Sequence, residues 1–149
     1  MGDSVSQLLS ELGVRTFASY VPTRTEPDPE VSATYYPVLF DEAGMLPPGC
    51  WGTSPLVPSR RGWPHQPSAQ TRLQTIDVAL VPALGVDKSG VRLGKGGGWY
   101  DRALLDIDAP IFAVVHFDEV LPKNSLPHES HDLLVDGYIT ETGFSFINR

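Results

Sequence analysis

Residues 76–84 have the sequence Ile-Asp-Val-Ala-Leu-Val-Pro-Ala-Leu, a nearly continuous apolar stretch of strand length. A strand that is buried on both faces requires this composition, so we expect it at the centre of a parallel sheet. A second apolar run over residues 111–117 predicts a neighbouring strand, and residues 137–141 predict a short one. Residues 99–105 predict a helix between the first two strands, and this order predicts a right-handed β-α-β crossover. The sequence therefore indicates an α/β fold.

The flanking segments predict further elements of such a fold. Apolar residues recur at helical spacing over residues 1–13, and Gly13 ends the run, so a short helix is expected there. Residues 14–21 and 34–40 predict extended strands. Residues 85–90 are turn-prone and predict a loop after the central strand.

Residues 45–75 differ in kind from the rest of the chain. They hold six prolines between Pro47 and Pro67, together with Trp51 and Trp63, and few aliphatic side chains. Proline removes backbone donors and fixes φ, so this composition predicts a long loop. This loop is either an exposed surface loop or a lid over a binding site. The lid is considered because long loops with large aromatic residues often cover a binding site.

Composition limits the class of protein. The chain has 149 residues, of which 41% are hydrophobic and 19% charged, so we expect one folded domain over residues 1–149. A net charge of −7 and a pI of about 4.9 argue against a nucleic acid or an anionic membrane as the main partner. A single cysteine, Cys50, excludes an internal disulfide and a cysteine-rich zinc site. These features predict a reduced, cytoplasmic protein.

The most informative segment is residues 91–102, Val-Arg-Leu-Gly-Lys-Gly-Gly-Gly-Trp-Tyr-Asp-Arg. Its four glycines let backbone N–H groups approach an anion, and a following helix would favour phosphate through its dipole. Arg92 and Lys95 bracket this turn and add positive charge. The Walker A pattern is absent. The dinucleotide fingerprint fails because Trp99 stands at its third glycine and because the turn is expected to follow a long loop instead of a strand end. Phosphate binding is the preferred interpretation, and a flexible structural turn is the alternative.

Two aspartates could hold a metal near this turn. Asp101 either complements the helix dipole or binds Mg²⁺ against phosphate oxygens. Asp132 is a second possible oxygen ligand. His128 and His131 lack a third soft ligand, so zinc is not favoured.

These residues resemble the 5-formyltetrahydrofolate cyclo-ligase family, also named 5,10-methenyltetrahydrofolate synthetases. Residues 76–85 match the family's aliphatic strand that ends in Val-Pro-Gly/Ala-Leu, and residues 87–102 match its Asp-x-x-Gly-x-Arg-Leu-Gly and Gly-x-Gly-Tyr-Tyr-Asp-Arg elements. Residues 131–136 are similar to its His-Asp-x-x-Val-Asp element, and residues 20–28 to its Leu-Pro…Gly-Glu-Val-Asp stretch. The match is loose between residues 30 and 70.

The resemblance implies a three-layer α/β/α fold with a mostly parallel sheet, NagB/RpiA/CoA-transferase-like. It also implies that ATP, with Mg²⁺, drives the closure of 5-formyltetrahydrofolate to 5,10-methenyltetrahydrofolate with release of ADP and phosphate. The partners would be these small molecules, and the protein a monomer or weak homodimer.

The resemblance also implies site residues. Those for ATP are Arg92, Leu93, Gly94, Lys95, Gly96, Gly97, Gly98, Trp99 and Tyr100. Those for the folate are Val21, Glu26, Lys95, Gly96, Gly97, Gly98 and Trp99, with Glu26 accepting hydrogen bonds from the pterin. Those for Mg²⁺ are Asp101 and Asp132.

The chain departs from the family pattern at two places. Trp99 replaces the first tyrosine of the Tyr-Tyr-Asp element, which changes the width of the pocket. Family members begin with a longer basic helix whose Lys and Arg reach the ATP phosphates, whereas the first basic residue here is Arg15. Either the start is misassigned or trimmed, or Arg60 and Arg61 substitute, or the chain no longer turns over.

Three hypotheses of function remain. The first is the ATP-dependent cyclo-ligase, and the second is a member of the family that binds folate or nucleotide without catalysis. The third is a sugar-phosphate or acyl-CoA enzyme on a related scaffold, which would need a carboxylate and a general base near the glycine turn.

Overall fold

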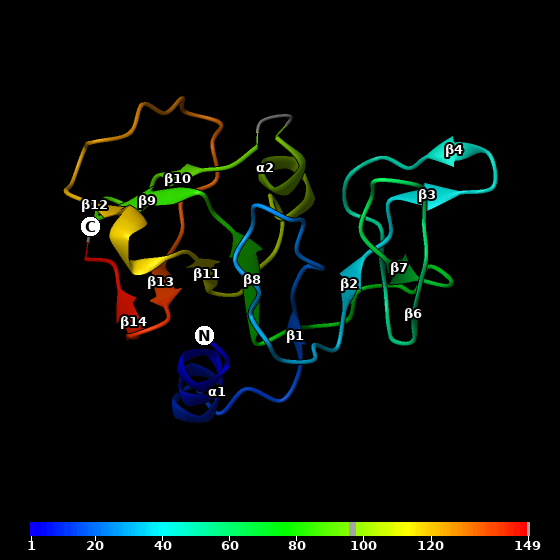
Figure 1. The fold of residues 1–149 in the computed structure, drawn as a ribbon, viewed down its shortest axis with the longest axis horizontal. Helices are drawn as coiled ribbons and strands as arrows, with labels where there is room; N and C mark the ends of the chain where they lie inside the picture. The colour runs from blue at the N-terminus through cyan, green and yellow to red at the C-terminus, as the bar shows by residue number, and fades with distance from the viewer. Residues whose placement is uncertain (96–97, 149) are drawn as a thin grey trace.

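The computed structural model describes residues 1–95 and 98–148. Within these residues the centre is a five-stranded sheet in the order β1-β8-β11-β13-β14 (Figure 1). Its strands are β1 (Phe17–Ala18), β8 (Val78–Pro82), β11 (Ile111–Val114), β13 (Gly137–Thr140) and β14 (Gly143–Phe146). The first four pair in parallel, and β14 joins β13 antiparallel. The expected strands over residues 76–84, 111–117 and 137–141 are therefore confirmed in position and direction.

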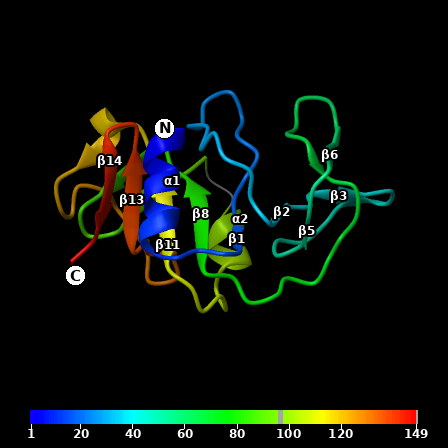
Figure 2. The same ribbon diagram turned by 90° about the horizontal axis from the view of Figure 1, so that it is seen from below.

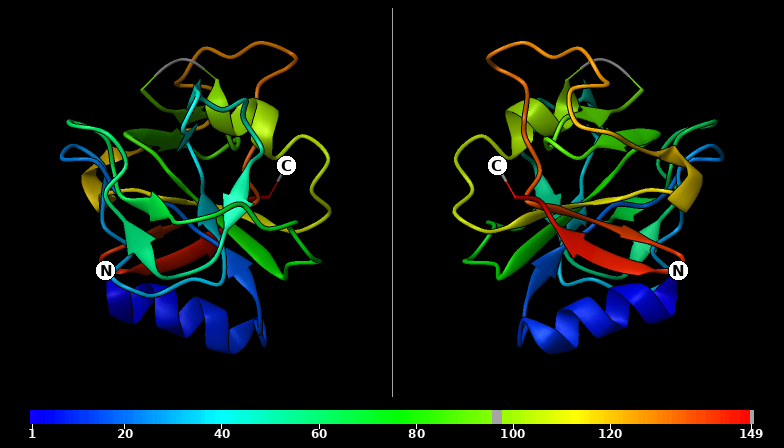
Figure 3. Two further views of the ribbon diagram at one scale, coloured as in Figure 1. Left: turned by 90° about the vertical axis from the view of Figure 1, so that its right-hand side faces the viewer. Right: turned by 90° about the vertical axis from the view of Figure 1, so that its left-hand side faces the viewer.

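Helices lie on both faces of this sheet, as the three-layer prediction requires. Helix α1 (Gly2–Glu11) covers one face beside β13 and β14 (Figure 2). Helix α2 (Trp99–Ala103) lies on the opposite face, so α1 and α2 enclose the sheet from below and above in Figure 3. The mostly parallel α/β architecture is confirmed.

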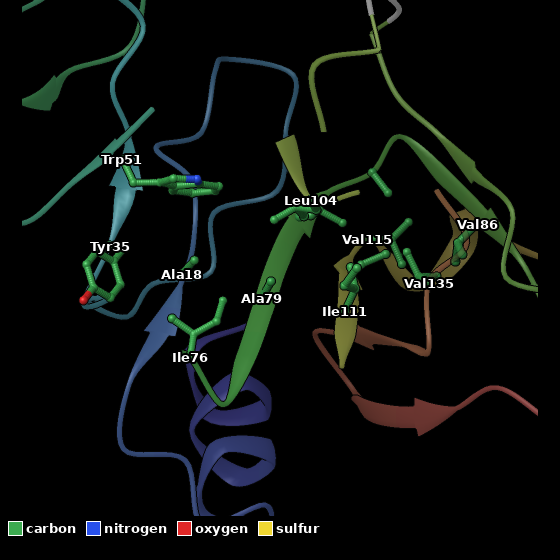
Figure 4. Close-up of a cluster of buried hydrophobic side chains, with 13 residues drawn as sticks. Ala18, Tyr35, Trp51, Ile76, Ala79, Val86, Leu104, Ile111, Val115 and Val135 are labelled. Carbon is green, nitrogen blue, oxygen red and sulfur yellow. The ribbon is translucent and has the colours of Figure 1, made fainter. Parts of the chain in front are cut away.

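The pleat of β8 divides the core between these faces. Val78 and Leu80 join the cluster under α1, whereas Ala79 and Val81 join the cluster on the side of α2. Figure 4 shows part of the second cluster, in which Leu104 lies over the end of β8. All five residues of β8 are buried, which explains the continuous apolar composition of this strand.

The predicted loop over residues 85–90 is wrong in part. Its first half forms β9 (Gly85–Asp87), which pairs antiparallel with β10 (Arg92–Leu93) and parallel with β12 (Val120–Leu121). The buried Asp87 carboxylate accepts hydrogen bonds from the backbone N–H groups of Ser89 and Val91, and this stabilises the turn between the two strands. Turn-forming residues therefore mark a hairpin here, and the glycine segment follows a strand directly.

Strand ends also differ from their predicted positions. Strand β11 ends at Val114, and Phe117–Glu119 forms a 3-10 helix (η1) instead of the end of a strand. Strand β1 has two residues where eight were predicted, because the chain pairs with β8 only there.

The proline-rich residues form short paired strands instead of an irregular loop. The pairs are β2 (Tyr36–Pro37) with β5 (Trp51–Gly52), β3 (Phe40–Asp41) with β4 (Gly44–Met45), and β6 (Leu56–Val57) with β7 (Gln66–Pro67). We call residues 36–67 the proline-rich unit; it lies to the right of the sheet in Figure 1.

A buried glutamine joins the halves of this unit. The Gln66 side chain accepts hydrogen bonds from Leu39 N and Phe40 N, at 2.9 and 3.1 Å, and donates one to Phe40 O. Hydrogen bonds of the Gln66 side chain hold together backbone segments that longer strand pairing would join in a larger sheet. The hydrophobic pattern of the sequence therefore does not reveal these strands.

Among the described helices, none has the length and apolar character needed to cross a membrane. The expectation of a cytoplasmic location stays a prediction.

Candidate active site

A cavity of about 610 Å³ lies where the glycine segment meets the proline-rich unit and the loop after β1. Its walls include predicted site residues from three separate stretches of sequence: Val21, Glu26, Arg92, Leu93, Gly94, Lys95, Gly98, Trp99, Tyr100, Asp101 and Asp132. Gly96 and Gly97 lie outside the described residues. Residues more than 100 positions apart therefore line one cavity.

Arg92 is the central cation of this cavity. It lies on β10, its Nη1 donates to Pro82 O at 2.7 Å, and its guanidinium carbon is 5.4 Å from the centre of the Tyr100 ring. Burial lowers the pKa of the Arg92 guanidinium, while nearby acidic groups, Asp101 foremost, act in the opposite direction. Its Nε is buried without a hydrogen-bond partner among the described residues. Arginine stays protonated in such surroundings, so the site carries a desolvated positive charge.

Gly94 makes the position of this arginine possible. A Cβ at Gly94 would lie 2.7 Å from Arg92 Nη1, closer than real side chains approach. A side chain at this position would displace the end of Arg92, so the glycine allows the guanidinium to lie where it does.

The acidic end of the cavity is built from α2 and the loop before β13. Asp101 Oδ1 accepts a hydrogen bond from Leu133 N at 2.8 Å, which ties the helix to that loop. Asp132, the residue before Leu133, also lines the cavity, and its Oδ2 accepts from Glu129 N at 2.8 Å. The two aspartates predicted to bind a metal thus belong to one wall, 31 positions apart in sequence.

These aspartates suit a magnesium ion better than zinc. Within residues 1–95 and 98–148, no three His, Cys, Asp or Glu side chains are grouped so that they could hold a metal. The exposed ring of His131 lies 3.4 Å from a Glu129 carboxylate oxygen and 3.6 Å from an Asp132 carboxylate oxygen. Magnesium usually takes one or two carboxylates and completes its shell with phosphate oxygens and water, and the pair fits that pattern.

Lys95 reaches across the cavity to the loop after β1. Its ammonium donates to the Thr23 hydroxyl, and Thr23 N donates to Glu26 Oε1 at 2.9 Å. Thr23 therefore links Glu26, which is predicted to bind the folate, with Lys95, which is predicted to bind phosphate. Thr23 itself lines the cavity and was not predicted.

Aromatic side chains connect the glycine segment with the proline-rich unit. Trp99 packs edge-on against Trp51 of β5, with ring centres 5.7 Å apart, and against Tyr100 at 4.8 Å. Burial raises the pKa of the Tyr100 hydroxyl, and the charge of Glu26 adds to this effect, so the phenol stays neutral. Trp51 is buried, and of the two tryptophans in the proline-rich unit it is Trp63 that lines the cavity.

Several lining residues were missed by reasoning from sequence. The apolar wall comes from the proline-rich unit: Pro37, Leu39, Met45, Leu46, Trp63 and Pro64, with His65 beside them. The prolines and large aromatic residues of this segment are typical of a loop that covers a binding site. In the structure the segment forms one wall of the cavity. Arg60 and Arg61 do not belong to the described lining residues.

The helix after the glycines is shorter than predicted. It ends at Ala103 instead of residue 105, and five residues support only a small macrodipole. Among the described residues, Arg92, Lys95 and Arg102 line the cavity and supply positive charge for an anion at this end.

This arrangement has a charged end and an apolar wall. The charged end offers cations for an anion and two carboxylates for a metal ion, and the wall offers flat aromatic and proline surfaces. A ligand pair with a phosphate portion and a planar ring system is chemically complementary to such a cavity.

The model of the 5-formyltetrahydrofolate cyclo-ligase family matches residues 5–141. The chain belongs to this family. A curated relative, 5-formyltetrahydrofolate cyclo-ligase of Mycolicibacterium smegmatis, is 38% identical over 144 residues, which span 85% of this chain and 73% of the relative. The mouse enzyme of the same name is 28% identical over 113 residues, which span 68% of this chain and 49% of the relative. The family takes its name from a ligase, so the resemblance stated from sequence is confirmed.

Solved structures of two family members share the fold. The NMR structure of Aquifex aeolicus 5,10-methenyltetrahydrofolate synthetase superposes with a TM-score of 0.74 and 23% identity, covering 99% of this chain and 81% of that chain. The Mycoplasma pneumoniae 5,10-methenyltetrahydrofolate synthetase gives a TM-score of 0.62 at 18% identity, covering 93% and 84%. These likenesses concern the fold alone.

Proposed function

We propose that this chain is an ATP-dependent cyclo-ligase that converts 5-formyltetrahydrofolate to 5,10-methenyltetrahydrofolate with release of ADP and phosphate. Two findings support the proposal: membership of the family, and a single cavity that gathers the motif residues from three stretches of sequence. The second carries more weight for this chain, because it concerns the chain's own residues.

The chemistry requires an activated formyl oxygen. The formyl oxygen attacks the γ-phosphorus of ATP, and ADP leaves. The N10 lone pair then attacks the formyl carbon, N10 loses its proton to water, and the carbon–oxygen bond breaks with phosphate as the leaving group. Phosphoryl transfer of this kind depends on positioning and on neutralisation of charge more than on a protein nucleophile.

The cavity residues take matching parts in this scheme. Arg92 and Lys95 hold phosphate oxygens, Arg92 as a desolvated charge and Lys95 after it leaves Thr23. Glu26 accepts hydrogen bonds from the pterin ring. The wall formed by Leu39, Trp63 and their neighbours packs against the flat ring system and excludes water.

Asp101 and Asp132 would hold Mg²⁺, which when bound neutralises charge on the phosphate oxygens. Asp101 retains one oxygen that accepts from Leu133 N, so its other oxygen is the one available to a ligand. This part of the proposal is independent of the identity of the folate.

A second candidate function is binding of folate or nucleotide without turnover. Among the described residues, α1 carries no lysine or arginine, and the permanent cations that line the cavity are Arg92, Lys95 and Arg102. A cavity with few cations favours weak nucleotide binding or slow phosphoryl transfer.

One assay separates the two functions. The purified chain is mixed with 5-formyltetrahydrofolate, ATP and MgCl₂, and the methenyl absorbance and ADP release are followed together. The cyclo-ligase predicts that both signals rise together and that both vanish when any one component is omitted. Binding of 5-formyltetrahydrofolate by calorimetry with no product would support the non-catalytic function instead.

A further inference from the structure

Strand β14 forms an open edge of the central sheet. It is the last strand in the order β1-β8-β11-β13-β14, at the lower left in Figure 1, and among the described residues it pairs with β13 alone. The strand at the opposite edge, β1, is covered, because Ala18 forms a parallel bridge with Tyr35. An uncovered edge presents backbone N–H and C=O groups with which another strand can pair.

The pairing with β13 determines which backbone groups of β14 face outward. Ile147 N donates to Asp136 O at 2.9 Å, so these two residues form a hydrogen-bonded pair of the antiparallel ladder. Hydrogen-bonded and non-hydrogen-bonded pairs alternate along such a ladder, so Ser145 also bonds to β13. The N–H and C=O groups of Phe144 and Phe146 therefore point away from β13, at the open edge.

The side chains of these two phenylalanines lie on the face of the sheet that carries α1. Phe144 packs against the cluster under α1, and the centre of the Phe146 ring lies 6.1 Å from that of Phe144 and 5.4 Å from that of Phe112. Figure 2 shows α1 in front of the inner strands, with β14 to its left. Phe146 is therefore left 55% exposed. An aromatic side chain at the edge lacks a covering partner on its outer side.

Strand β14 lacks the features that usually protect an edge strand. Natural edges often carry a lysine, a proline or a bulge. The sequence Gly-Phe-Ser-Phe at residues 143–146 has no charged residue and no proline, and its register with β13 is continuous. The preceding charge, Glu141, is held by His116 and by Phe117 N. On a chain with a net charge of −7, a second copy can therefore approach this segment with little local repulsion.

We propose that β14 pairs antiparallel with β14 of a second copy of this chain, around a twofold axis at Ser145. In this register Phe144 of one copy lies opposite Phe146 of the other, and each such pair exchanges two backbone hydrogen bonds. Because the interface is isologous, the outward groups of both copies are satisfied together. Each exposed Phe146 ring packs beside Phe144 of the other copy, and the two five-stranded sheets become one continuous sheet.

This dimer leaves the cavity open. None of the described residues that line the cavity belongs to β13 or β14, and the proline-rich unit lies beyond β1, at the other end of the sheet (Figure 1). The pairing is therefore independent of the proposed function. Stable interfaces usually bury about 1,200–2,000 Å², and a strand of four residues buries less, so we expect a dissociation constant on the order of 100 µM.

Sedimentation equilibrium of the purified chain over a concentration series measures this association. Phe146→Val keeps the outward N–H and should weaken the dimer about fivefold, through loss of the ring packing. Phe146→Pro also removes the outward N–H of each copy without breaking a hydrogen bond to β13, and should weaken the dimer about tenfold more. Phe117→Val is the control, because Phe117 is 60% exposed but lies on η1, and it should behave as the wild type.

A cysteine at the axis tests the register directly. Ser145→Cys is made in a Cys50→Ser background, since Cys50 is the single cysteine of the chain. Opposite residues of a non-hydrogen-bonded antiparallel pair have Cα atoms about 4.5 Å apart, a distance that a disulfide can span. Mild oxidation should therefore give a covalent dimer. Thr142→Cys is the control, because Thr142 is exposed on the same hairpin but lies three positions from the axis.

A chain that stays monomeric at several hundred micromolar would overturn the proposal. So would a wild-type dimer that Phe146→Pro leaves intact, or disulfide formation that is equally fast with Thr142→Cys. Thermal unfolding verifies that each variant is folded, and if Phe146→Pro is not, the two cysteine variants decide the question. Raising the salt concentration should tighten the dimer, because it screens the repulsion between two negatively charged copies; a dimer that salt dissociates would contradict an uncharged interface.

Discussion

Replacing Asp101 with asparagine removes one negative charge from the cavity and keeps an oxygen that can accept the hydrogen bond from Leu133 N, 2.8 Å long in the structure. Because this hydrogen bond survives in a neutral form, we expect the free energy of unfolding to fall by no more than about 1 kcal/mol. Asp101→Ala loses the acceptor altogether and separates the structural contribution from the electrostatic one.

The effect of Asp101→Asn on the affinity for ATP should depend on whether Mg²⁺ is present. With Mg²⁺ present, loss of one charged ligand is expected to cost about 1.5–3 kcal/mol, which is roughly a 10- to 150-fold loss of affinity for ATP. Without Mg²⁺, Asp101 is a negative charge facing the phosphates, and it is the foremost of the charges that oppose the effect of burial on the Arg92 pKa. Its removal should therefore leave ATP binding unchanged or tighter.

Calorimetric titration of ATP into the wild type and Asp101→Asn, each with and without MgCl₂, measures both effects. Asp106→Asn is a matched control, because Asp106 is exposed on the chain after α2 and is not among the described lining residues. Equal affinities of Asp101→Asn and wild type for ATP in the presence of Mg²⁺ would refute the assignment of Asp101 as a metal ligand. A similar loss in both conditions would show that Asp101 acts only by holding the Leu133 segment.

Three further predictions concern separate parts of the structure. Arg92→Lys keeps the charge but loses the planar fork that reaches Pro82 O, so the KM for ATP should rise about tenfold more than the KM for the folate; equal rises in steady-state kinetics would mean that Arg92 only orders the turn. Gly137→Ala should lower the free energy of unfolding by about 1–3 kcal/mol and the melting temperature by several degrees. The reason is that a Cβ there would lie 2.3 Å from the Phe112 ring. Gly85→Ala, whose Cβ would meet no atom closer than 3.7 Å, is its control, and equal melting temperatures would contradict the packing. Burial acts to raise the pKa of Asp87, but hydrogen bonds from Ser89, Leu126 and Val91 outweigh it and lower that pKa. The folded state therefore disfavours protonation of the Asp87 carboxylate relative to the unfolded state. The free energy of unfolding should fall as the pH drops below about 4. Asp87→Asn should lose stability at neutral pH and show a weaker dependence in this acid range, and an unchanged slope in acid denaturation would contradict the role of the carboxylate.

Strong local patterns predicted the central sheet well. The apolar runs that became β8 and β11 have strand length and are buried on both faces, and few other environments accept such sequences. Helix α1 followed from apolar spacing and from Gly13, whose φ of 64° is where a helix ends readily. The motif residues could be named from sequence because the glycine segment is contiguous.

Weak local patterns failed where pairing is held by side chains or by distant strands. The proline-rich unit consists of two-residue strands, and Gln66 joins them over 26 positions. Strand β9 pairs with β10 in a local hairpin and also with β12, which is more than 30 residues later in the chain. Such contacts leave no periodicity that can be recognised, since strands of two or three residues span little more than one two-residue repeat of an alternating pattern.

The sequence by itself determined the α/β class, the family and the chemistry available at the glycine segment, because these reside in contiguous residues whose types have few other uses. Tertiary structure decided which side chains share a cavity: it brought Glu26 and Asp132 to Arg92, and it placed Trp63 and Leu39 as the apolar wall. The physical reason is that pairing of distant strands costs chain entropy that only the completed core offsets, so the partners of a site residue are set by the whole fold.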